Sequence, residues 1–459
     1  MTLLQLAYRV GGHKLAALLV FSACGAAQVT GPSLTYYCFN EGPNNGYEPT
    51  ATPVMNAGPG NQRVLYGTTY YGSGPCPEGC GTVFAAFPPE SPGSVWSETV
   101  LYTFLGGDDG QNPGGGVTLA PDGTLYGTTV QGGTPLACSG FGCGTVFALG
   151  PPASPGGAWQ ETVLYAFTGG SDGSGPRSGV VIGRGGVLYG TAATGGSTAC
   201  ATPGEFIGCG VIYSLQPPQS PGEPWTRTVL YSFQDGSDGA DPNGLALGPE
   251  GTLYGTTEGG GLFGCGEFLT YPGCGVVYKL TPPASPGRTW TYDVLYRFQG
   301  GGDAAKPYAA VTLGPGGVLY GTASQGGSTD GCGPWESGCG AVFSLSPPAS
   351  SGQAWTETLV HAFRALDGAV PYAGVAIGKQ GELYGTTSAG GPGGYYGTVY
   401  VLLPASSSGD VWTERTIYDF ISSGPYSPLG GVIAAGGLLY GTTTECGTPG
   451  GGAVFALTP

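Results

Sequence analysis

The sequence predicts an all-β fold, a seven-bladed β-propeller with four-stranded blades. The tetrapeptide Leu-Tyr-Gly-Thr recurs seven times, roughly 60 residues apart, and such a period is typical of repeat architectures. Each copy lies in a unit of four short apolar segments, separated by many of the 94 glycines and 40 prolines. No window shows a sustained helical period. The recurring tyrosines are Tyr66, Tyr126, Tyr189, Tyr254, Tyr320, Tyr384 and Tyr440.

The unit that begins at Gly115 illustrates the four expected strands. Strand a covers residues 117–119, strand b residues 124–129, strand c residues 144–149 and strand d residues 159–167. β-Branched and aromatic residues dominate all four segments. Four strands per unit favour a propeller, in which radial repetition leaves only short, protected edges. A stacked solenoid is the alternative, and it would need distinct polar caps at both ends.

The two ends of the repeat region predict how the ring closes. The last unit contains strands a, b and c and then stops at Pro459, whereas residues 34–39 align with strand d of the other units. We therefore expect the N-terminal strand to complete the last blade. A blade order of d, a, b and c, without strand exchange, is the alternative. Strand a is short, apolar and followed by a tight turn, which favours it as the innermost strand and so favours the exchange.

Composition and the N-terminal segment predict an exported protein. Residues 1–27 combine a basic start, a short apolar run and small residues, as a signal peptide does, which leaves residues 28–459 as one propeller domain. The residues around Cys24 resemble a lipoprotein cleavage box, so lipidation is an alternative to simple cleavage. The net charge of −16 argues against nucleic acid and anionic membranes as partners. No apolar run reaches the ~20 residues of a membrane span, and we expect a secreted or cell-envelope monomer.

The repeat motif resembles that of a known family. The pattern LYGTT, GTVF and ETVLY, followed by Asp-Gly and proline, is similar to the GloVer tandem-repeat proteins of bacteria, over about residues 33–459. The resemblance implies an exported protein with propeller-like repeats. It implies no established enzymatic activity, so it supplies no catalytic residues.

Thirteen cysteines predict disulfides, which are usual in exported β-proteins. Ten fall in pairs in the b–c loops of five units, without the C-x-x-C spacing or partner histidines of a zinc site. Cys38 lies on the N-terminal strand and Cys446 in the last b–c loop, so pairing of that strand with the last strand c would bring them together. We predict that this bond locks the ring. The expected bonds are Cys76–Cys80, Cys138–Cys143, Cys200–Cys209, Cys265–Cys274, Cys332–Cys339 and Cys38–Cys446.

The b–c loops vary between units while the strands do not, and variable loops on a rigid scaffold are common binding sites. By strand alternation they share one face with the d–a segments that cross from blade to blade. Their aromatic and acidic residues suit a sugar, or equally a protein partner. The alternative is that disulfides and aromatics merely order long loops. The candidate ligand-binding residues are Tyr70, Tyr71, Phe141, Phe206, Glu258, Phe263, Glu267, Tyr271, Trp335, Glu336, Tyr395 and Tyr396.

Catalytic and metal sites are less favoured. His361 is the only histidine after the leader, and it replaces a strand-d tyrosine, which indicates a packed strand residue. The recurring tyrosines, and one tryptophan per unit, are expected to pack between blades. Aspartates after strand d indicate turns; calcium, the one cofactor considered, is the alternative. These aspartates are Asp109, Asp172, Asp238, Asp303 and Asp367.

Three functions stay open. The first is an exported, non-catalytic propeller that binds glycan or an extracellular protein through the b–c loop face. The second is a glycoside hydrolase or polysaccharide lyase on that face, which needs suitably placed carboxylates. The third is a structural cell-envelope protein. The expected inner strands, such as residues 117–119, 180–182 and 245–247, contain no charged residue, which disfavours the enzyme. The available loop carboxylates are Glu258, Glu267, Asp330 and Glu336.

Overall fold

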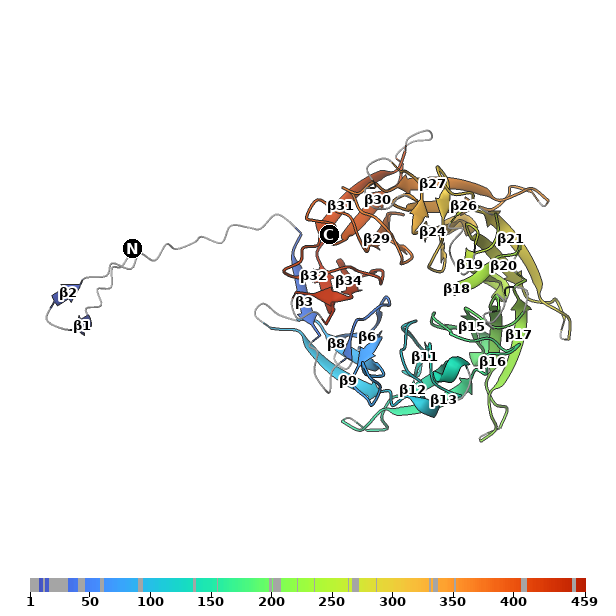
Figure 1. The fold of residues 1–459 in the computed structure, drawn as a ribbon, viewed down its shortest axis with the longest axis horizontal. Helices are drawn as coiled ribbons and strands as arrows, with labels where there is room; N and C mark the ends of the chain where they lie inside the picture. Colours follow the sequence, from blue (N-terminus) through green and yellow to red (C-terminus); the bar gives the residue numbers. More distant parts are fainter. Residues whose placement is uncertain are drawn as a thin grey trace.

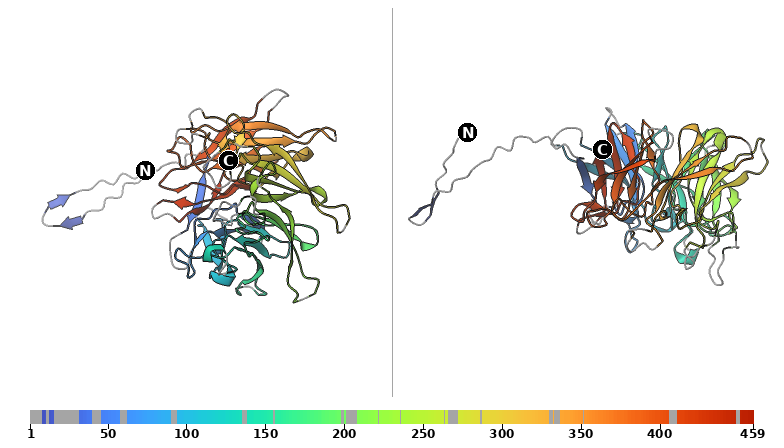
Figure 2. Two further views of the ribbon diagram at one scale, coloured as in Figure 1. Left: turned by 45° about the vertical axis from the view of Figure 1, so that its right-hand side comes forward. Right: turned by 90° about the horizontal axis from the view of Figure 1, so that it is seen from above.

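Seven four-stranded antiparallel sheets surround a central axis as a seven-bladed β-propeller, which confirms the predicted fold (Figure 1). In edge-on view the strands run roughly along that axis (Figure 2). The computed structural model describes residues 8–10, 13–15, 32–39, 46–57, 62–89, 94–134, 138–154, 156–197, 200, 208–220, 222–234, 236–262, 264–265, 272–285, 287–329, 332, 337–350, 352–405, 411–447 and 451–459.

Each blade runs from an innermost strand a to an outermost strand d. Blade 1 comprises β5 (Val54–Ala57), β6 (Arg63–Thr69), β8 (Thr82–Phe87) and β9 (Ser97–Thr103). Blade 2 comprises β10 (Val117–Leu119), β11 (Leu125–Thr129), β12 (Thr145–Gly150) and β13 (Gln160–Ala166). Blade 3 comprises β14 (Val181–Ile182), β15 (Leu188–Ala192), β16 (Val211–Gln216) and β17 (Thr226–Ser232). Blade 4 comprises β18 (Ala240–Leu247), β19 (Leu253–Gly259), β20 (Val276–Thr281) and β21 (Thr291–Arg297). Blade 5 comprises β23 (Thr312–Leu313), β24 (Leu319–Ala323), β26 (Ala341–Ser346) and β27 (Thr356–Ala362). Blade 6 comprises β28 (Ala376–Ile377), β29 (Leu383–Thr387), β30 (Thr398–Leu403) and β31 (Thr413–Asp419).

Blade 7 joins the two ends of the ring. Its strands are β33 (Ile433–Ala435), β34 (Leu438–Thr443), β36 (Ala453–Leu457) and β3 (Leu34–Cys38). β3 pairs with β36 in antiparallel register, with Leu34 opposite Leu457 and Cys38 opposite Ala453. The N-terminal strand therefore completes the last blade, as predicted, and the alternative order without strand exchange is wrong.

Short elements complete the described structure. Three two-stranded sheets pair a crossing segment with the start of a b–c loop: β4 (Gly46–Tyr47) with β7 (Tyr71–Gly72), β22 (Ala304–Ala305) with β25 (Gln325–Gly326), and β32 (Pro425–Tyr426) with β35 (Glu445–Cys446). Near the N-terminus, β1 (Tyr8–Val10) pairs with β2 (His13–Leu15). Single 3-10 turns cover Gly107–Asp109, Cys138–Gly140, Arg184–Gly186, Pro249–Gly251 and Pro315–Gly317. Within the described ranges, no helix has the length and apolar character to cross a membrane.

The Leu-Tyr-Gly-Thr motif is explained by packing between and within blades. The strand-b glycine lies under the aromatic ring of strand c, so that a Cβ at Gly67 would lie 2.5 Å from the Phe84 ring. The strand-b tyrosine packs edge-on against a tryptophan of the next blade, as in Tyr126–Trp225 with ring centroids 6.2 Å apart. The threonine reaches the next blade as well, because Thr128 Oγ1 donates to the Ser178 carbonyl at 3.0 Å. The motif is therefore a structural unit, as expected.

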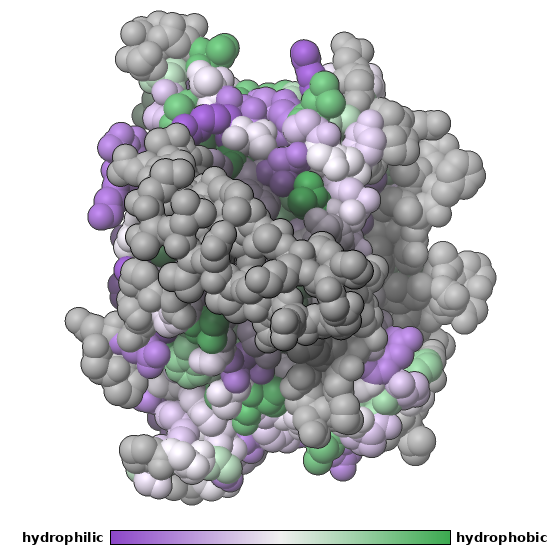
Figure 3. All heavy atoms as spheres, turned by 90° about the vertical axis from the view of Figure 1, so that its left-hand side faces the viewer, coloured by the Kyte–Doolittle hydropathy of each residue, from purple (hydrophilic) through white to green (hydrophobic). Residues whose placement is uncertain are grey.

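The apolar core lies between neighbouring blades rather than at the axis. One representative core cluster combines Phe167 and Val146 of blade 2 with Leu188, Tyr213 and Leu215 of blade 3, all fully buried. On the side of the rim shown in Figure 3, coloured hydrophobic residues are scattered among hydrophilic ones. The rigid, buried blade interfaces leave the loops at the two faces as the places where sequence can vary.

Candidate functional site

The d–a crossing segments build the centre of the face that carries the b–c loops. Each crossing contains a proline, and the residue before it adopts a left-handed backbone conformation with φ close to +60°. Its N–H donates to a carbonyl at the end of the b–c loop, as Asn112 does to Cys80 at 2.8 Å and Lys306 to Cys274 at 2.9 Å. Its own carbonyl accepts from the residue that follows strand b, as in Ser324 N–H to Lys306 O at 3.0 Å. The b–c loops therefore hold the crossings in place.

Disulfides secure most of these loops. The structure contains six, at the six pairs that the sequence predicts, with Cα–Cα distances of 5.0 to 5.8 Å. The second cysteine of each b–c pair supplies the carbonyl that anchors the crossing, so the disulfide fixes the crossing as well as the loop. In blade 6, where the loop has no cysteine pair, the Tyr396 carbonyl accepts from Ser427 N–H at 2.8 Å instead.

The residue after each crossing proline points to the axis, and the seven equivalent positions line one cavity of about 600 Å³. We call this cavity the central mouth. Its ring comprises Thr50, Gly114, Arg177, Asn243, Tyr308, Tyr372 and Leu429, and Tyr70, Val130 and Ser178 complete the lining. Residues that are hundreds of positions apart in the sequence thus meet in a single site.

One side of the central mouth carries a buried charged cluster. Arg177 Nη2 donates to both carboxylate oxygens of Asp241, at 2.9 and 3.0 Å. The Asp241 side chain is 7% exposed and that of Arg177 is 36% exposed, so Arg177 is the member of this pair that reaches the cavity. Lys306 is also buried, and Glu258 is close enough to influence all three charges electrostatically.

In this cluster, burial and the neighbouring opposite charges shift each pKa in opposite directions. Burial raises the pKa of Asp241 to about 6, although the adjacent Arg177 opposes the shift. Burial alone would lower the pKa of Arg177, but the Asp241 carboxylate raises it overall. Burial lowers the pKa of Lys306, opposed by Glu258 and Asp241. Asp241 is therefore the member of the cluster whose protonation changes near neutral pH.

The expectation that the inner strands bring no charge to the channel is wrong for blade 4. There β18 begins at Ala240 and includes Asp241, so the innermost strand is longer than residues 245–247. Arg177 and Lys306 come from crossing segments, which the sequence presents as glycine- and proline-rich turns, whereas Glu258 lies on β19. The signal that could have located them is the position relative to the crossing proline, which is the same in every unit.

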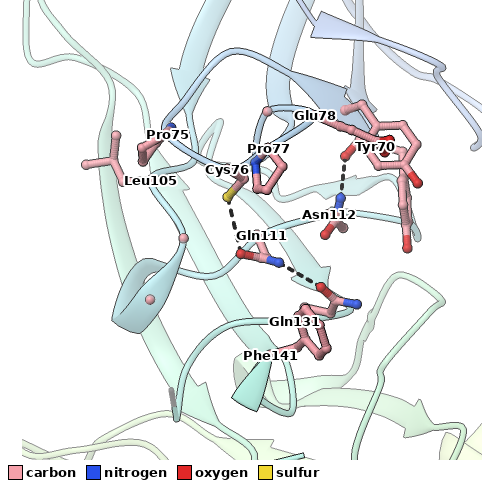
Figure 4. Close-up of a pocket in the computed structure, with 14 residues that line it drawn as sticks. Tyr70, Pro75, Cys76, Pro77, Glu78, Leu105, Gln111, Asn112, Gln131 and Phe141 are labelled. Atoms are coloured by element: carbon pink, nitrogen blue, oxygen red, sulfur yellow. Dashed lines mark hydrogen bonds between the residues drawn. The ribbon is translucent and has the colours of Figure 1, made fainter. Parts of the chain in front are cut away.

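A second depression, which we call the loop groove, lies between the b–c loops of blades 1 and 2 (Figure 4). Its volume is about 450 Å³, and it brings together Tyr70, Tyr71 and Phe141 of the predicted binding residues. Their partners in the lining include Glu78, Leu105, Gln111, Asn112 and Gln131. Because Tyr70 lines both the loop groove and the central mouth, the two sites are contiguous.

The polar side chains of the loop groove are positioned by hydrogen bonds. Gln111 Nε2 donates to Gln131 Oε1 at 2.7 Å, and Asn112 Nδ2 donates to the Tyr70 carbonyl at 3.0 Å (Figure 4). Tyr71 stacks on Tyr47, with ring centroids 5.6 Å apart, whereas Phe141 is 63% exposed. The groove therefore combines fixed amides with an accessible aromatic ring.

The remaining predicted binding residues lie outside the loop groove or outside the described residues. Glu258 belongs to the charged cluster of the central mouth. Tyr395, 54% exposed, and Tyr396, which packs on Tyr426, lie in the b–c loop of blade 6 and do not line the loop groove. The predicted positions outside the described residues are Phe206, Phe263, Glu267, Tyr271, Trp335 and Glu336, as is Asp330.

The aspartates considered for calcium are engaged in local hydrogen bonds. Asp172 Oδ2 accepts from the hydroxyl of Tyr165 at 2.9 Å and from the Thr168 N–H at 2.8 Å, and Asp109, Asp238 and Asp303 repeat this arrangement. His361 takes the place of the tyrosine in blade 5, with Nε2 3.2 Å from Asp367 Oδ2. Over the described part of the chain, no group of three or more His, Cys, Asp or Glu residues could hold a metal ion.

The fold and its loops define a disulfide-stabilised, seven-bladed β-propeller whose crossing segments form the central mouth on one face. The chain belongs to the Gloeobacter/Verrucomicrobia repeat family, whose model matches residues 26–203 and 333–459. This confirms the resemblance carried by the repeat motif. No curated protein matches the chain.

Solved structures share the architecture at low similarity. PorZ, a surface component of the type-IX secretion system of Porphyromonas gingivalis, is 13% identical with a TM-score of 0.47; the match covers 97% of this chain and 48% of PorZ, so the chain spans about half its length. The polysaccharide lyase Uly1 is 10% identical over 94% of each chain, with a TM-score of 0.49. The aldose sugar dehydrogenase of Streptomyces coelicolor is 14% identical over 84% of this chain and 99% of that one, with a TM-score of 0.40. Similarity at this level does not indicate a function.

Proposed function

We propose that this protein is an exported, non-catalytic β-propeller that binds glycan through the b–c loop face. The observation that carries the proposal is the loop groove, where Tyr70, Tyr71 and Phe141 lie beside hydrogen-bonded amides and Glu78. Aromatic faces pack against the C–H surface of a sugar ring, while amides and a carboxylate bond its hydroxyls. A neutral or weakly charged ligand suits a chain with a net charge of −16.

Export is part of the same proposal. Six disulfides are typical of an oxidising compartment outside the cytoplasm. Residues 1–27 would be the signal peptide, removed by simple cleavage or, with lipidation, at Cys24. The propeller would then act in the cell envelope or the medium.

A protein partner is the second candidate, and the apolar character of the b–c loop face favours it. Its loops and crossings carry large hydrophobic side chains that are more than a third exposed: Leu105, Phe141, Leu262, Tyr308, Leu366, Tyr395 and Ile421. Such residues form the centres of protein interfaces. They are spread over several blades, whereas the loop groove is a single concave site, which favours glycan.

A polysaccharide and glycan array probed with the full chain tests the proposal. Phe141→Ala should weaken binding about tenfold, because a sugar–aromatic contact of about 1.5 kcal/mol is lost. Val95→Ala, which removes an apolar side chain that is even more exposed, from a c–d loop, is the control and should bind like the parent. Absence of binding to every glycan would reject the proposal and favour the protein partner. Release of shortened products would instead support the enzyme alternative.

A further inference from the structure

The charged cluster of the central mouth is not needed by the fold. The position before the crossing proline accepts Gly175, Val370 and Ser427 with the same left-handed φ and the same backbone hydrogen bonds. Asp241 and Lys306 occupy this position in blades 4 and 5 and are 5% and 2% exposed. Burying charged groups costs free energy unless they are paired. Asp241 is paired with Arg177, which lines the cavity, and a role for this pair in the cavity is the simplest reason for its presence.

Asp241 presents Arg177 to the central mouth. Both Asp241 carboxylate oxygens accept from Nη2 of Arg177, and Arg177, whose side chain is 36% exposed, lines the cavity. A guanidinium group has five N–H donors in a planar fork, so the bond to Asp241 leaves donors for a second planar acceptor. Arg177 is the only cation among the seven ring positions.

Tyrosines surround this guanidinium group. Tyr308 lies close enough to Arg177 to contribute to its raised pKa, and it packs edge-on against Tyr372, with ring centroids 5.0 Å apart. Tyr70 lines the same cavity and connects it to the loop groove. The mouth thus offers one cationic fork beside aromatic faces, next to the groove assigned to a glycan.

We propose that the central mouth binds the carboxylate of an acidic sugar unit, a hexuronate, with Arg177 as the hydrogen-bond donor and Tyr70, Tyr308 and Tyr372 packing around the sugar ring. This inference rests on the proposed glycan-binding function and names the class of ligand. Hydrogen bonds from a guanidinium group to a carboxylate are charge-assisted and roughly twice as strong as neutral ones.

The charge balance limits the ligand to isolated acidic units. Arg177 and Lys306 are offset by Asp241 and Glu258, and the whole chain carries a net charge of −16. A densely charged polyanion would be repelled over the range of the Debye length, about 8 Å at physiological salt. A single carboxylate in contact with Arg177 avoids most of that repulsion.

The cluster also predicts how binding depends on pH. The ligand carboxylate and the Asp241 carboxylate repel each other beside the guanidinium group that both contact, so protonation of Asp241, whose pKa burial raises to about 6, strengthens binding of the ligand. Glu258, Lys306, Tyr308 and Tyr70 are the other ionisable groups that interact with this pair. An uronate, with a pKa close to the ~3.5 of an α-carboxyl group, stays ionised at pH 5. Binding should therefore be tighter at pH 5 than at pH 7.5.

Calorimetric titration of the full chain with sodium D-glucuronate and sodium D-galacturonate tests this inference, with D-glucose and D-galactose as neutral probes. We expect both uronates to bind about tenfold or more tightly than the hexoses, the factor that one charge-assisted hydrogen bond supplies. The double variant Arg177→Gln/Asp241→Asn removes both charges without leaving either unpaired, and it should lose the preference and its pH dependence. Arg184→Gln, on an exposed turn at the opposite face of blade 3, is the control and should retain both.

Equal affinity for uronates and hexoses, or full uronate binding by the double variant, would overturn this inference. If the array then still shows Phe141-dependent binding of neutral glycans, the proposed function stands without it. Uronate binding that depends on Arg177, with no loss in Phe141→Ala, would support the mouth and reject the loop groove. Absence of any saccharide binding would reject both.

Discussion

Cys38, in the first strand of the ring, and Cys446, in the last blade, are joined by a disulfide with their Cα atoms 5.8 Å apart and a sequence separation of 408. The bond lies beside the β3–β36 pairing that closes blade 7. Cross-linking such a distant pair restricts the unfolded chain far more than a b–c loop disulfide does.

The first prediction follows from this difference in loop length. The loop-entropy model gives about 6 kcal/mol for the Cys38–Cys446 bond and about 2 kcal/mol for Cys76–Cys80. Cys38→Ser/Cys446→Ser should therefore lower the free energy of unfolding several times more than Cys76→Ser/Cys80→Ser. Equilibrium urea unfolding measures both, and equal losses would contradict the ring-closing role.

The second prediction concerns the strand-b glycine. Gly67→Ala places a methyl group 2.5 Å from the Phe84 ring, so the strand or the ring must shift, at about 1–3 kcal/mol. Gly150→Ala is the control, because its Cβ meets no atom closer than 3.7 Å. Thermal unfolding should show a lower Tm for the first variant only.

The third prediction is that the ring is more stable in mild acid than above pH 7. Burial raises the pKa of Glu98, Glu161 and Glu357 on the outer strands to about 7. A raised folded-state pKa stabilises the fold fully below the unfolded value of 4.5, and this contribution is lost as pH rises through 7. The urea midpoint should fall between pH 5 and pH 8, and Glu161→Gln should reduce that slope. An unchanged slope in the variant would show that Glu161 is not responsible.

The fourth prediction tests the structural role of His361. His361→Tyr restores the tyrosine that donates to the equivalent aspartate in blades 1 to 4, so its Tm should match or exceed that of the parent. His361→Phe keeps the ring but leaves Asp367 without this partner, and it should cost about 1 kcal/mol. Loss of glycan binding in the tyrosine variant, with unchanged stability, would instead indicate a functional histidine.

Much of the fold could be predicted because the same pattern of apolar and turn residues recurs in all seven units. Strand c, expected at residues 144–149, is observed as Thr145–Gly150, and strand d, expected at 159–167, as Gln160–Ala166. The candidate site was predicted only in part. Tyr70, Tyr71 and Phe141 meet in the loop groove, but Tyr395 and Tyr396 lie in another blade. Loop aromatics carry no periodic signal that says which of them are neighbours.

By itself, the sequence determined the strands and the sevenfold repeat, because alternating apolar residues and turn residues act over short stretches. It also determined how the ring closes, because the cysteine positions and a single strand pairing are enough to predict it. Only the tertiary structure decided which residues meet at the axis. Ring closure brings positions from Thr50 to Leu429 to one cavity, and it buries Asp241 behind Arg177. Burial and ion pairing depend on distances between blades, which no single repeat contains, and so the central mouth emerges only when all seven blades are in place.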